Sequence, residues 1–153
     1  MGRAIRRIYV EQAVAGHPRA LAVRRRFPGA EMVPCERWGE VFNRRHQSFR
    51  LQKRRPALIL AQKHGRAVLE ALPGYGIGGA RNFYFSHMLN CLYYCRYCFL
   101  QGMFRSAHYV LFVNYEAFQR AVDERLAEAG EMLEFCHQEL LGHVPEARLF
   151  QCR

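Results

Sequence analysis

Hydrophobic and polar positions alternate in short blocks along this chain, and several of the blocks predict β-strands. The residues RIYVE (7–11) predict a short strand, and the aromatic run NFYFSH (82–87) predicts another. The run HYVLFVN (108–114) is apolar almost throughout, as in a buried strand. The run ALILAQ (57–62) is equally apolar, and its periodicity does not decide between a buried strand and a buried helix.

Other blocks have the spacing of helices. The segment HPRALAVRRRF (17–27) predicts a basic helix that ends at Pro28-Gly29. The segment that follows residue 114 predicts a longer helix, with Asn114 as N-cap and Gly130 just after the end. Its apolar residues form one stripe suited to packing against a sheet: Phe118, Ala121, Val122, Leu126 and Ala129.

The order of the elements predicts an α/β protein with a parallel sheet. Strand 82–87, a cysteine-rich loop, strand 108–114 and the helix after it follow one another as in parallel α/β folds. Residues 131–153 leave room for one more short helix, around Met132, Cys136 and Leu140.

A glycine-rich stretch suggests a domain boundary. The residues LPGYGIGGAR (72–81) contain four glycines, but a predicted strand follows them instead of the helix that a phosphate-binding loop requires. We therefore expect a basic N-terminal lobe over 1–72, a linker over 73–80 and a second domain over 81–153.

The formal charge of +10 is concentrated in the first part of the chain. Residues 1–66 hold 16 Lys and Arg against 4 Asp and Glu, whereas residues 67–153 hold 7 against 9. Such a basic half predicts contact with a polyanion, nucleic acid being the usual one; the alternative is a well-solvated surface. The runs Arg24 to Arg26 and Lys53 to Arg55 suit phosphates but read no sequence by themselves.

The chain has no apolar run of membrane-spanning length, and residues 1–12 lack the apolar core of a secretory signal. We therefore expect a cytoplasmic protein that makes no contact with a membrane. In that compartment six cysteines are expected as thiols or metal ligands and not as disulfides.

The stretch NCLYYCRYCFLQG (90–102) carries the candidate chemistry. Cys91, Cys95 and Cys98 follow the spacing C-x3-C-x2-C, which lets three thiolates converge on one metal centre. Soft sulfur ligands favour zinc, copper(I) or an iron–sulfur cluster. A structural zinc normally has a fourth protein ligand, whereas a [4Fe–4S] cluster held by three cysteines leaves one iron open.

This spacing, with Tyr97 just before the third cysteine, resembles the signature of radical S-adenosylmethionine enzymes. The longer stretch SHMLNCLYYCRYCFLQGMFRSAHYVLFVNYEAF (86–118) resembles the spore photoproduct lyase family. The resemblance implies a [4Fe–4S] cluster on Cys91, Cys95 and Cys98, with S-adenosylmethionine on the open iron and Tyr97 against its adenine. It also implies an external electron donor and a DNA substrate, because the lyase repairs a thymine adduct by abstracting a hydrogen atom.

The resemblance implies a partial barrel of six strand–helix units, of which this chain contains the first and at most part of the next. We therefore expect an incomplete (β/α)6 barrel, in a truncated fragment without full activity, preceded by a small basic α/β lobe. The resemblance assigns no catalytic residue. Phe99 stands where the lyase has a tyrosine, and the context of Cys136, EFCHQ, is unlike that of the family's hydrogen-returning cysteine.

Two other interpretations of the cysteine stretch remain open. His87 precedes Cys91 by the spacing H-x3-C, so His87 and the three cysteines could form a zinc site in a small nucleic-acid-binding module. Alternatively, no metal binds and the tyrosines belong to a plain core. Trp38 is expected as a core anchor more than as a base-stacking residue, and Cys35 and Cys152 are assigned no role.

Overall fold

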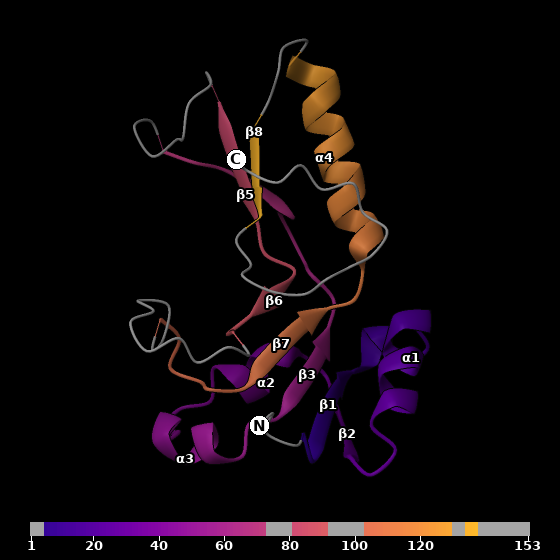
Figure 1. Ribbon diagram of the computed structural model, residues 1–153, viewed down its shortest axis with the longest axis vertical. Helices are drawn as coiled ribbons and strands as arrows, with labels where there is room; N and C mark the ends of the chain where they lie inside the picture. The colour runs from indigo at the N-terminus through magenta and orange to yellow at the C-terminus, as the bar shows by residue number, and fades with distance from the viewer. Residues whose placement is uncertain (1–4, 73–80, 92–102, 130–133, 138–153) are drawn as a thin grey trace. The chain divides into compact units, whose positions relative to one another are not determined.

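The computed structural model describes residues 5–72, 81–91, 103–129 and 134–137, and its contacts divide the chain into two compact units (Figure 1). The first unit consists of Met1–Gln62 and Met88–Val113, and the second of Lys63–His87 and Asn114–Arg153. This grouping differs from the predicted division, whose linker at 73–80 lies outside the described residues. The predicted domain boundaries therefore stay a prediction.

The first unit contains a five-stranded sheet in the order β2-β1-β3-β7-β6. Four strands run parallel to their neighbours, and β6 (Met88–Leu89) pairs antiparallel with β7. The parallel strands are β1 (Arg7–Glu11), β2 (Glu31–Cys35), β3 (Leu58–Ala61) and β7 (Tyr109–Phe112). The mixed α/β class with a parallel-rich sheet is thus confirmed.

The undecided run at 57–62 is a strand in the structure, and its position in the sheet explains its composition. β3 lies between β1 and β7, so it is paired on both edges, and its successive residues 59–61, which alternate between the two faces, are all buried. Ile59 and Leu60, together with Val110 of the neighbouring β7, have no exposed surface. Central parallel strands are continuous hydrophobic runs for this reason, which removes the alternation that would have identified a strand.

The basic helix predicted for 17–27 is present in the first unit as α1 (Pro18–Arg26). A 3-10 turn, η1 (Gln12–Val14), leads into this helix. The His17 ring accepts a hydrogen bond from the Arg19 amide at 3.2 Å, and proline occupies the first helical position. α1 packs Ala20 into a buried cluster with Ile8, Val14, Leu60 and Val113.

Two short helices, α2 (Trp38–Phe42) and α3 (Phe49–Arg54), complete the described helices of this unit. Trp38 packs against Phe42 and Phe112, with ring centroids 5.7 and 5.5 Å apart. The half-buried indole is therefore part of the core, as expected.

The second unit has a three-stranded sheet, β4 (Val68–Glu70)-β5 (Asn82–Phe85)-β8 (Glu134–His137), and the helix α4 (Tyr115–Ala129). Phe118 of α4 packs on Phe85 at a centroid distance of 5.8 Å. Asn114 directly precedes α4, at the predicted N-cap position, and its side chain bonds the backbone of Lys63: Oδ1 accepts from the amide at 2.8 Å and Nδ2 donates to the carbonyl at 3.2 Å.

Two local predictions are wrong. The strands at 82–87 and 108–114 do not share a sheet: β5 pairs with β4 and β8, and β7 pairs with β3 and β6. Residues 134–137 form strand β8 and not part of a helix, because they supply hydrogen-bonding partners for the edge of β5. Met132 and Leu140 lie outside the described residues. The partial barrel stays a prediction.

Among the described residues, no helix combines the length and the apolar content that crossing a membrane requires.

Candidate functional site

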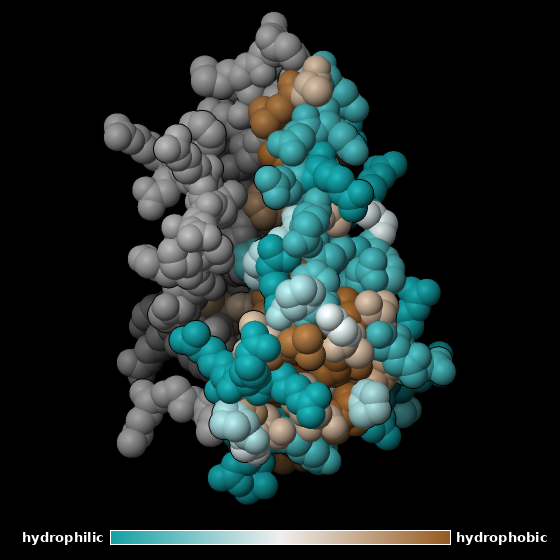
Figure 2. Space-filling view, turned by 90° about the vertical axis from the view of Figure 1, so that its right-hand side faces the viewer, coloured by the Kyte–Doolittle hydropathy of each residue, from teal (hydrophilic) through white to brown (hydrophobic). Residues whose placement is uncertain are grey.

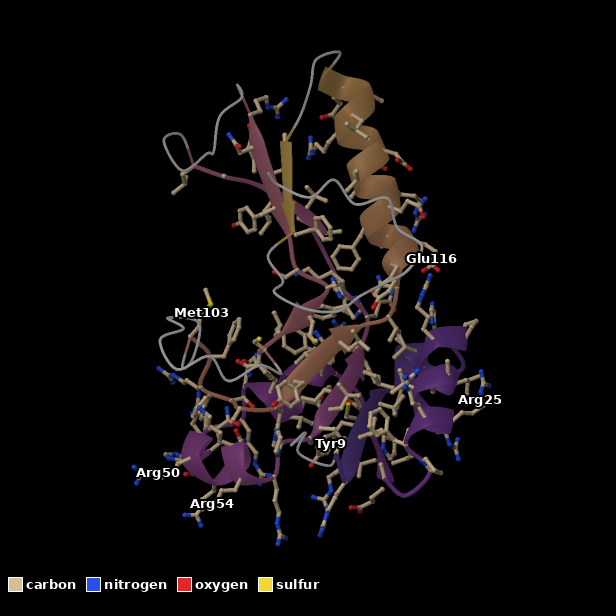
Figure 3. The ribbon with its side chains drawn as sticks, viewed as in Figure 1. Tyr9, Arg25, Arg50, Arg54, Met103 and Glu116 are labelled. Atoms are coloured by element: carbon tan, nitrogen blue, oxygen red, sulfur yellow. The ribbon has the colours of Figure 1, made fainter. Side chains whose placement is uncertain are left out.

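One concave site among the described residues of the first unit lies at the amino edge of its parallel strands. Because these strands run parallel, the residues that precede or begin them meet at one edge. A hollow of about 530 Å³ lies there, and two of its lining residues, Tyr9 and Arg54, are labelled in Figure 3. Its lining residues come from four strand starts and the end of α3: Arg6, Arg7, Tyr9, Glu31, Arg54, Arg55, Pro56, Ala57 and His108.

Four arginines and one carboxylate give the hollow a positive charge. Glu31 accepts hydrogen bonds from Arg7 at 2.7 and 2.8 Å, and this bonding raises the pKa of the Arg7 guanidinium further. Within the described part of the chain, Arg6, Arg54 and Arg55 have no carboxylate partner. Three of the four guanidinium groups are therefore available to an anion.

His108 contributes a neutral ring to the same hollow. Its Nδ1 accepts a hydrogen bond from the Ala57 amide at 3.1 Å, so the proton of the neutral ring is on Nε2. Burial, and then the nearby charge of Arg7, lowers the pKa of His108. The ring is thus kept uncharged at neutral pH, with Nε2–H as a hydrogen-bond donor.

The cysteine segment begins at this same edge of the sheet. Strand β6 runs antiparallel to β7, with Leu89 opposite Val110, so β6 ends where β7 begins. Asn90 follows with a positive φ of 64°, and Cys91 comes next as a half-buried residue. The cysteine segment therefore leaves the sheet at its amino edge. Parallel barrels place their active sites at the other edge, at the carboxyl ends of the strands.

Asn90 ties the two ends of the cysteine segment together. Its Nδ2 donates to the carbonyl oxygens of Ser106, at 2.7 Å, and His108, at 2.8 Å. Asparagine suits this position because it tolerates the left-handed conformation better than most residues do. The segment between Asn90 and Ser106 therefore starts and ends at points that are fixed to each other.

A glutamine network fixes the far end of the segment to α3. Gln52 Oε1 accepts from the Ala107 amide at 2.9 Å and from the Ser106 hydroxyl at 3.3 Å. Gln52 Nε2 in turn donates to Gln47 Oε1 at 2.7 Å. Ser106 is completely buried, so these bonds satisfy polar groups that water does not reach.

The predicted ligands are only partly covered by the structure. Cys91 is described, whereas Cys95, Cys98 and Tyr97 lie outside the described residues. Within the described ranges no three His, Cys, Asp or Glu side chains form a metal site. Three thiolates on one segment with fixed ends remain a donor set that fits a [4Fe–4S] cluster by its chemistry.

The histidine of the alternative zinc site is described in the second unit. His87 packs edge-on against Tyr115, with ring centroids 5.4 Å apart. Cys91 belongs to the first unit. The zinc arrangement stays a prediction.

The carboxyl edge of the sheet has a different chemistry. Glu11, at the end of β1, is completely buried, and its Oε2 accepts a hydrogen bond from the Gln62 amide at 2.7 Å. Cys35 ends β2 opposite Glu11, and burial, followed by the charges of Glu11 and Glu40, raises the pKa of its thiol to about 11. The Cys35 thiol is therefore protonated at neutral pH and is a poor metal ligand.

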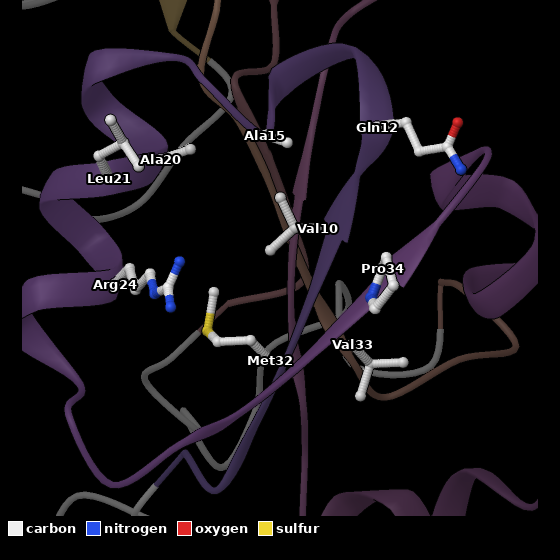
Figure 4. Close-up of a pocket in the computed structure, with 9 residues that line it drawn as sticks. All are labelled: Val10, Gln12, Ala15, Ala20, Leu21, Arg24, Met32, Val33 and Pro34. Carbon is white, nitrogen blue, oxygen red and sulfur yellow. The ribbon is translucent and has the colours of Figure 1, made fainter.

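A second, smaller hollow of about 180 Å³ lies between α1 and strands β1 and β2 (Figure 4). Apolar side chains such as Val10, Leu21 and Met32 line most of it, and Arg24 is its one cation. On the face shown in Figure 2, hydrophobic residues reach the surface of the first unit between hydrophilic ones. The hollow lacks the convergent polar groups that fix a ligand's orientation.

Sequence reasoning missed the hollow at the amino edge. The run Lys53 to Arg55 was recognisable as a phosphate contact, but Arg6 and His108 lie far from it in the sequence. Only the pairing of β1 with β3 and of β3 with β7 brings them together.

Comparison of the chain with protein-family models, with curated proteins and with solved structures finds no match.

Proposed function

We propose that this chain is a radical S-adenosylmethionine protein that resembles spore photoproduct lyase and acts on nucleic acid. The observation that carries the proposal is the spacing of Cys91, Cys95 and Cys98. The proposal includes the finer fold, an incomplete (β/α)6 barrel in a fragment of the full enzyme.

The proposal assigns a role to five residues of the cysteine segment and its start. Cys91, Cys95 and Cys98 would hold three irons of a [4Fe–4S] cluster, and Tyr97 would contact the adenine of S-adenosylmethionine. Asn90 positions the first ligand, because it links the start of the segment to the carbonyls of Ser106 and His108. When bound, the cluster supplies the electron, from an external donor, that cleaves the sulfonium cofactor.

The arrangement of the first unit supports a nucleic-acid partner. The unpaired arginines of the hollow and the start of the cysteine segment lie at the same edge of one sheet. A strand bound by its phosphates at this edge would lie at the edge where the chain reaches Cys91. Phosphate contacts position a nucleic acid without reading its sequence, as a repair enzyme requires.

Anaerobic reconstitution with iron and sulfide tests the proposal. We expect brown protein with about four irons per chain. Cys95→Ala should lose the cluster, because two thiolates do not hold it, whereas Cys35→Ala should keep it, because that thiol is protonated at the other edge. A colourless protein with one tightly bound zinc would replace the proposal by the zinc module. Full iron content in Cys95→Ala would disprove the ligand assignment.

A further inference from the structure

We propose that the hollow at the amino edge is a phosphate-binding site, which takes a backbone or terminal phosphate of a nucleic-acid strand. The inference rests on the nucleic-acid partner of the proposed function but not on the iron–sulfur cluster. Its ligand groups are the guanidinium groups of Arg6, Arg54 and Arg55 and the ring of His108.

The charges of the hollow select an anion. Arg6 precedes β1, and Arg54 and Arg55 lie at the end of α3, so the β1–β3 pairing that sets Ile8 opposite Leu58 brings these cations to one place. In the described part of the chain the only carboxylate that lines the hollow is Glu31, and it is engaged by Arg7. A cationic ligand would be repelled, whereas an anion would pair with the three remaining arginines.

The shape of the donors favours phosphate. Arginine presents a planar fork of N–H groups that matches two oxygens of a phosphate, and several forks can share its tetrahedral oxygens. His108 adds a neutral Nε2–H donor, because its Nδ1 is occupied by the Ala57 amide. The hollow, at about 530 Å³, lies in the size range of small-ligand pockets, so it has room for a phosphate with its sugar.

The ion pair of Arg7 and Glu31 lines one side of the hollow. Glu31 holds the Arg7 guanidinium in place by two short contacts, of 2.7 and 2.8 Å. The pair is more than half exposed, so it adds little stability. Because this ion pair leaves Arg7 less available to a ligand, Arg54 and Arg55 are the better residues to substitute.

The hollow is linked to the start of the cysteine segment through one residue. His108 lines the hollow, and its carbonyl oxygen accepts the hydrogen bond of Asn90, which directly precedes Cys91. A phosphate in the hollow would therefore lie close to the start of that segment, at Asn90 and Cys91.

Binding of a fluorescent single-stranded oligonucleotide to the full chain tests the site by anisotropy. The test variant is Arg54→Ala with Arg55→Ala, and the matched control is Arg25→Ala with Arg26→Ala, which removes the same charge from exposed residues of α1 (Figure 3). We expect at least a tenfold loss of affinity in the test variant and less than a threefold loss in the control. Equal losses would overturn the site, because they would show that only the total charge matters.

Four further ligands identify the chemical group that binds and its source. Inorganic phosphate and a nucleoside monophosphate should displace the oligonucleotide if the hollow takes a terminal phosphate. A strand without a terminal phosphate should bind equally well if the hollow takes a backbone phosphate. Poly-glutamate that binds as tightly as the strand, and that loses the same affinity in the test variant, would overturn a phosphate site.

The same titration on Cys95→Ala separates this inference from the cluster. Binding that persists in Cys95→Ala supports the phosphate site even if the cluster assignment fails. Binding that is absent from both the wild type and Cys95→Ala overturns the phosphate site and leaves the cluster to its own test.

Discussion

The two edges of the five-stranded sheet are built from the same four parallel strands, yet their chemistry differs. The amino edge presents Arg6, Arg54 and Arg55 without a carboxylate partner among the described residues. At the carboxyl edge, the buried Glu11 accepts a hydrogen bond from the chain itself, and the Cys35 thiol is protonated. Parallel sheets usually bind ligands at the carboxyl edge, so the phosphate site that we propose lies at the edge opposite to the usual one.

The direction of one short strand adds the start of the cysteine segment to the amino edge. Because β6 is antiparallel to β7, it delivers Cys91 to the edge at which the other strands begin. The proposed function therefore depends on the cysteine spacing and the charge of that edge, and not on a completed barrel.

The largest effect is expected from the strand that both edges share. Ile59 has no exposed surface, so Ile59→Ala should lower the free energy of unfolding by about 2–5 kcal/mol. Urea unfolding followed by circular dichroism measures this loss. The two edges of the sheet should unfold together, because β3 is the strand that they share. Leu51→Ala is the control, because Leu51 is 65% exposed. A loss below about 1 kcal/mol in Ile59→Ala would contradict the described core.

The carboxyl edge should matter for stability alone. Glu11→Ala leaves the backbone amide of the half-buried Gln62 without its acceptor, at a cost of up to about 3 kcal/mol. Glu11→Gln keeps an acceptor oxygen and should cost less. Oligonucleotide affinity should stay unchanged in a Glu11→Gln protein that folds, and a loss there would show that the two edges are not independent.

Asn90 should matter at the amino edge through the geometry of the cysteine segment. Asn90→Ala loses two hydrogen bonds and puts alanine at a φ of 64°, at a cost of about 1–2 kcal/mol for the backbone alone. Asn90→Gly is the control, because glycine accepts this φ. If the amide positions Cys91, both variants should take up less iron on reconstitution. Full iron uptake by Asn90→Gly would show that Asn90 matters only for the positive φ of the turn and does not position Cys91 through its side chain.

The smallest effect concerns pH. The pKa of His108 is lower in the fold than its ordinary value of 6.5, so the unfolded chain binds more protons at acid pH. The contribution of His108 to stability is therefore complete above pH 6.5 and is lost as the pH falls through the lower pKa of the folded state. His108→Gln should flatten this part of the pH profile of unfolding. Arg7, Tyr9 and the other arginines of the hollow face this ring, while Glu31 offsets part of their charge. An unchanged profile would contradict the burial of the ring.

The sequence predicted elements better than it predicted their arrangement. The strands at 7–11 and 108–114 and the helix that begins at Tyr115 were readable from local patterns. The partner of each strand was not, because pairing depends on residues distant in the sequence, and so β5 and β7 were wrongly assigned to one sheet.

The candidate site also has one part that the sequence predicts, the cysteine segment, and one part that it does not, the hollow at the amino edge. Cys91, Cys95 and Cys98 lie within eight residues, so their spacing is visible without a fold. The hollow joins Arg6, Arg54 and His108, and no local pattern connects them. Asn90 was likewise unremarkable in the sequence, because its role comes from a positive φ and from two carbonyls beyond the cysteine segment.

Electron paramagnetic resonance of the reconstituted and reduced chain, before and after addition of S-adenosylmethionine, tests the central claim most directly. Three cysteine ligands leave one iron open, so we predict the spectrum of a reduced [4Fe–4S] cluster that changes when the cofactor is added. A chain that forms no cluster, or whose cluster spectrum is the same with and without the cofactor, would contradict the account.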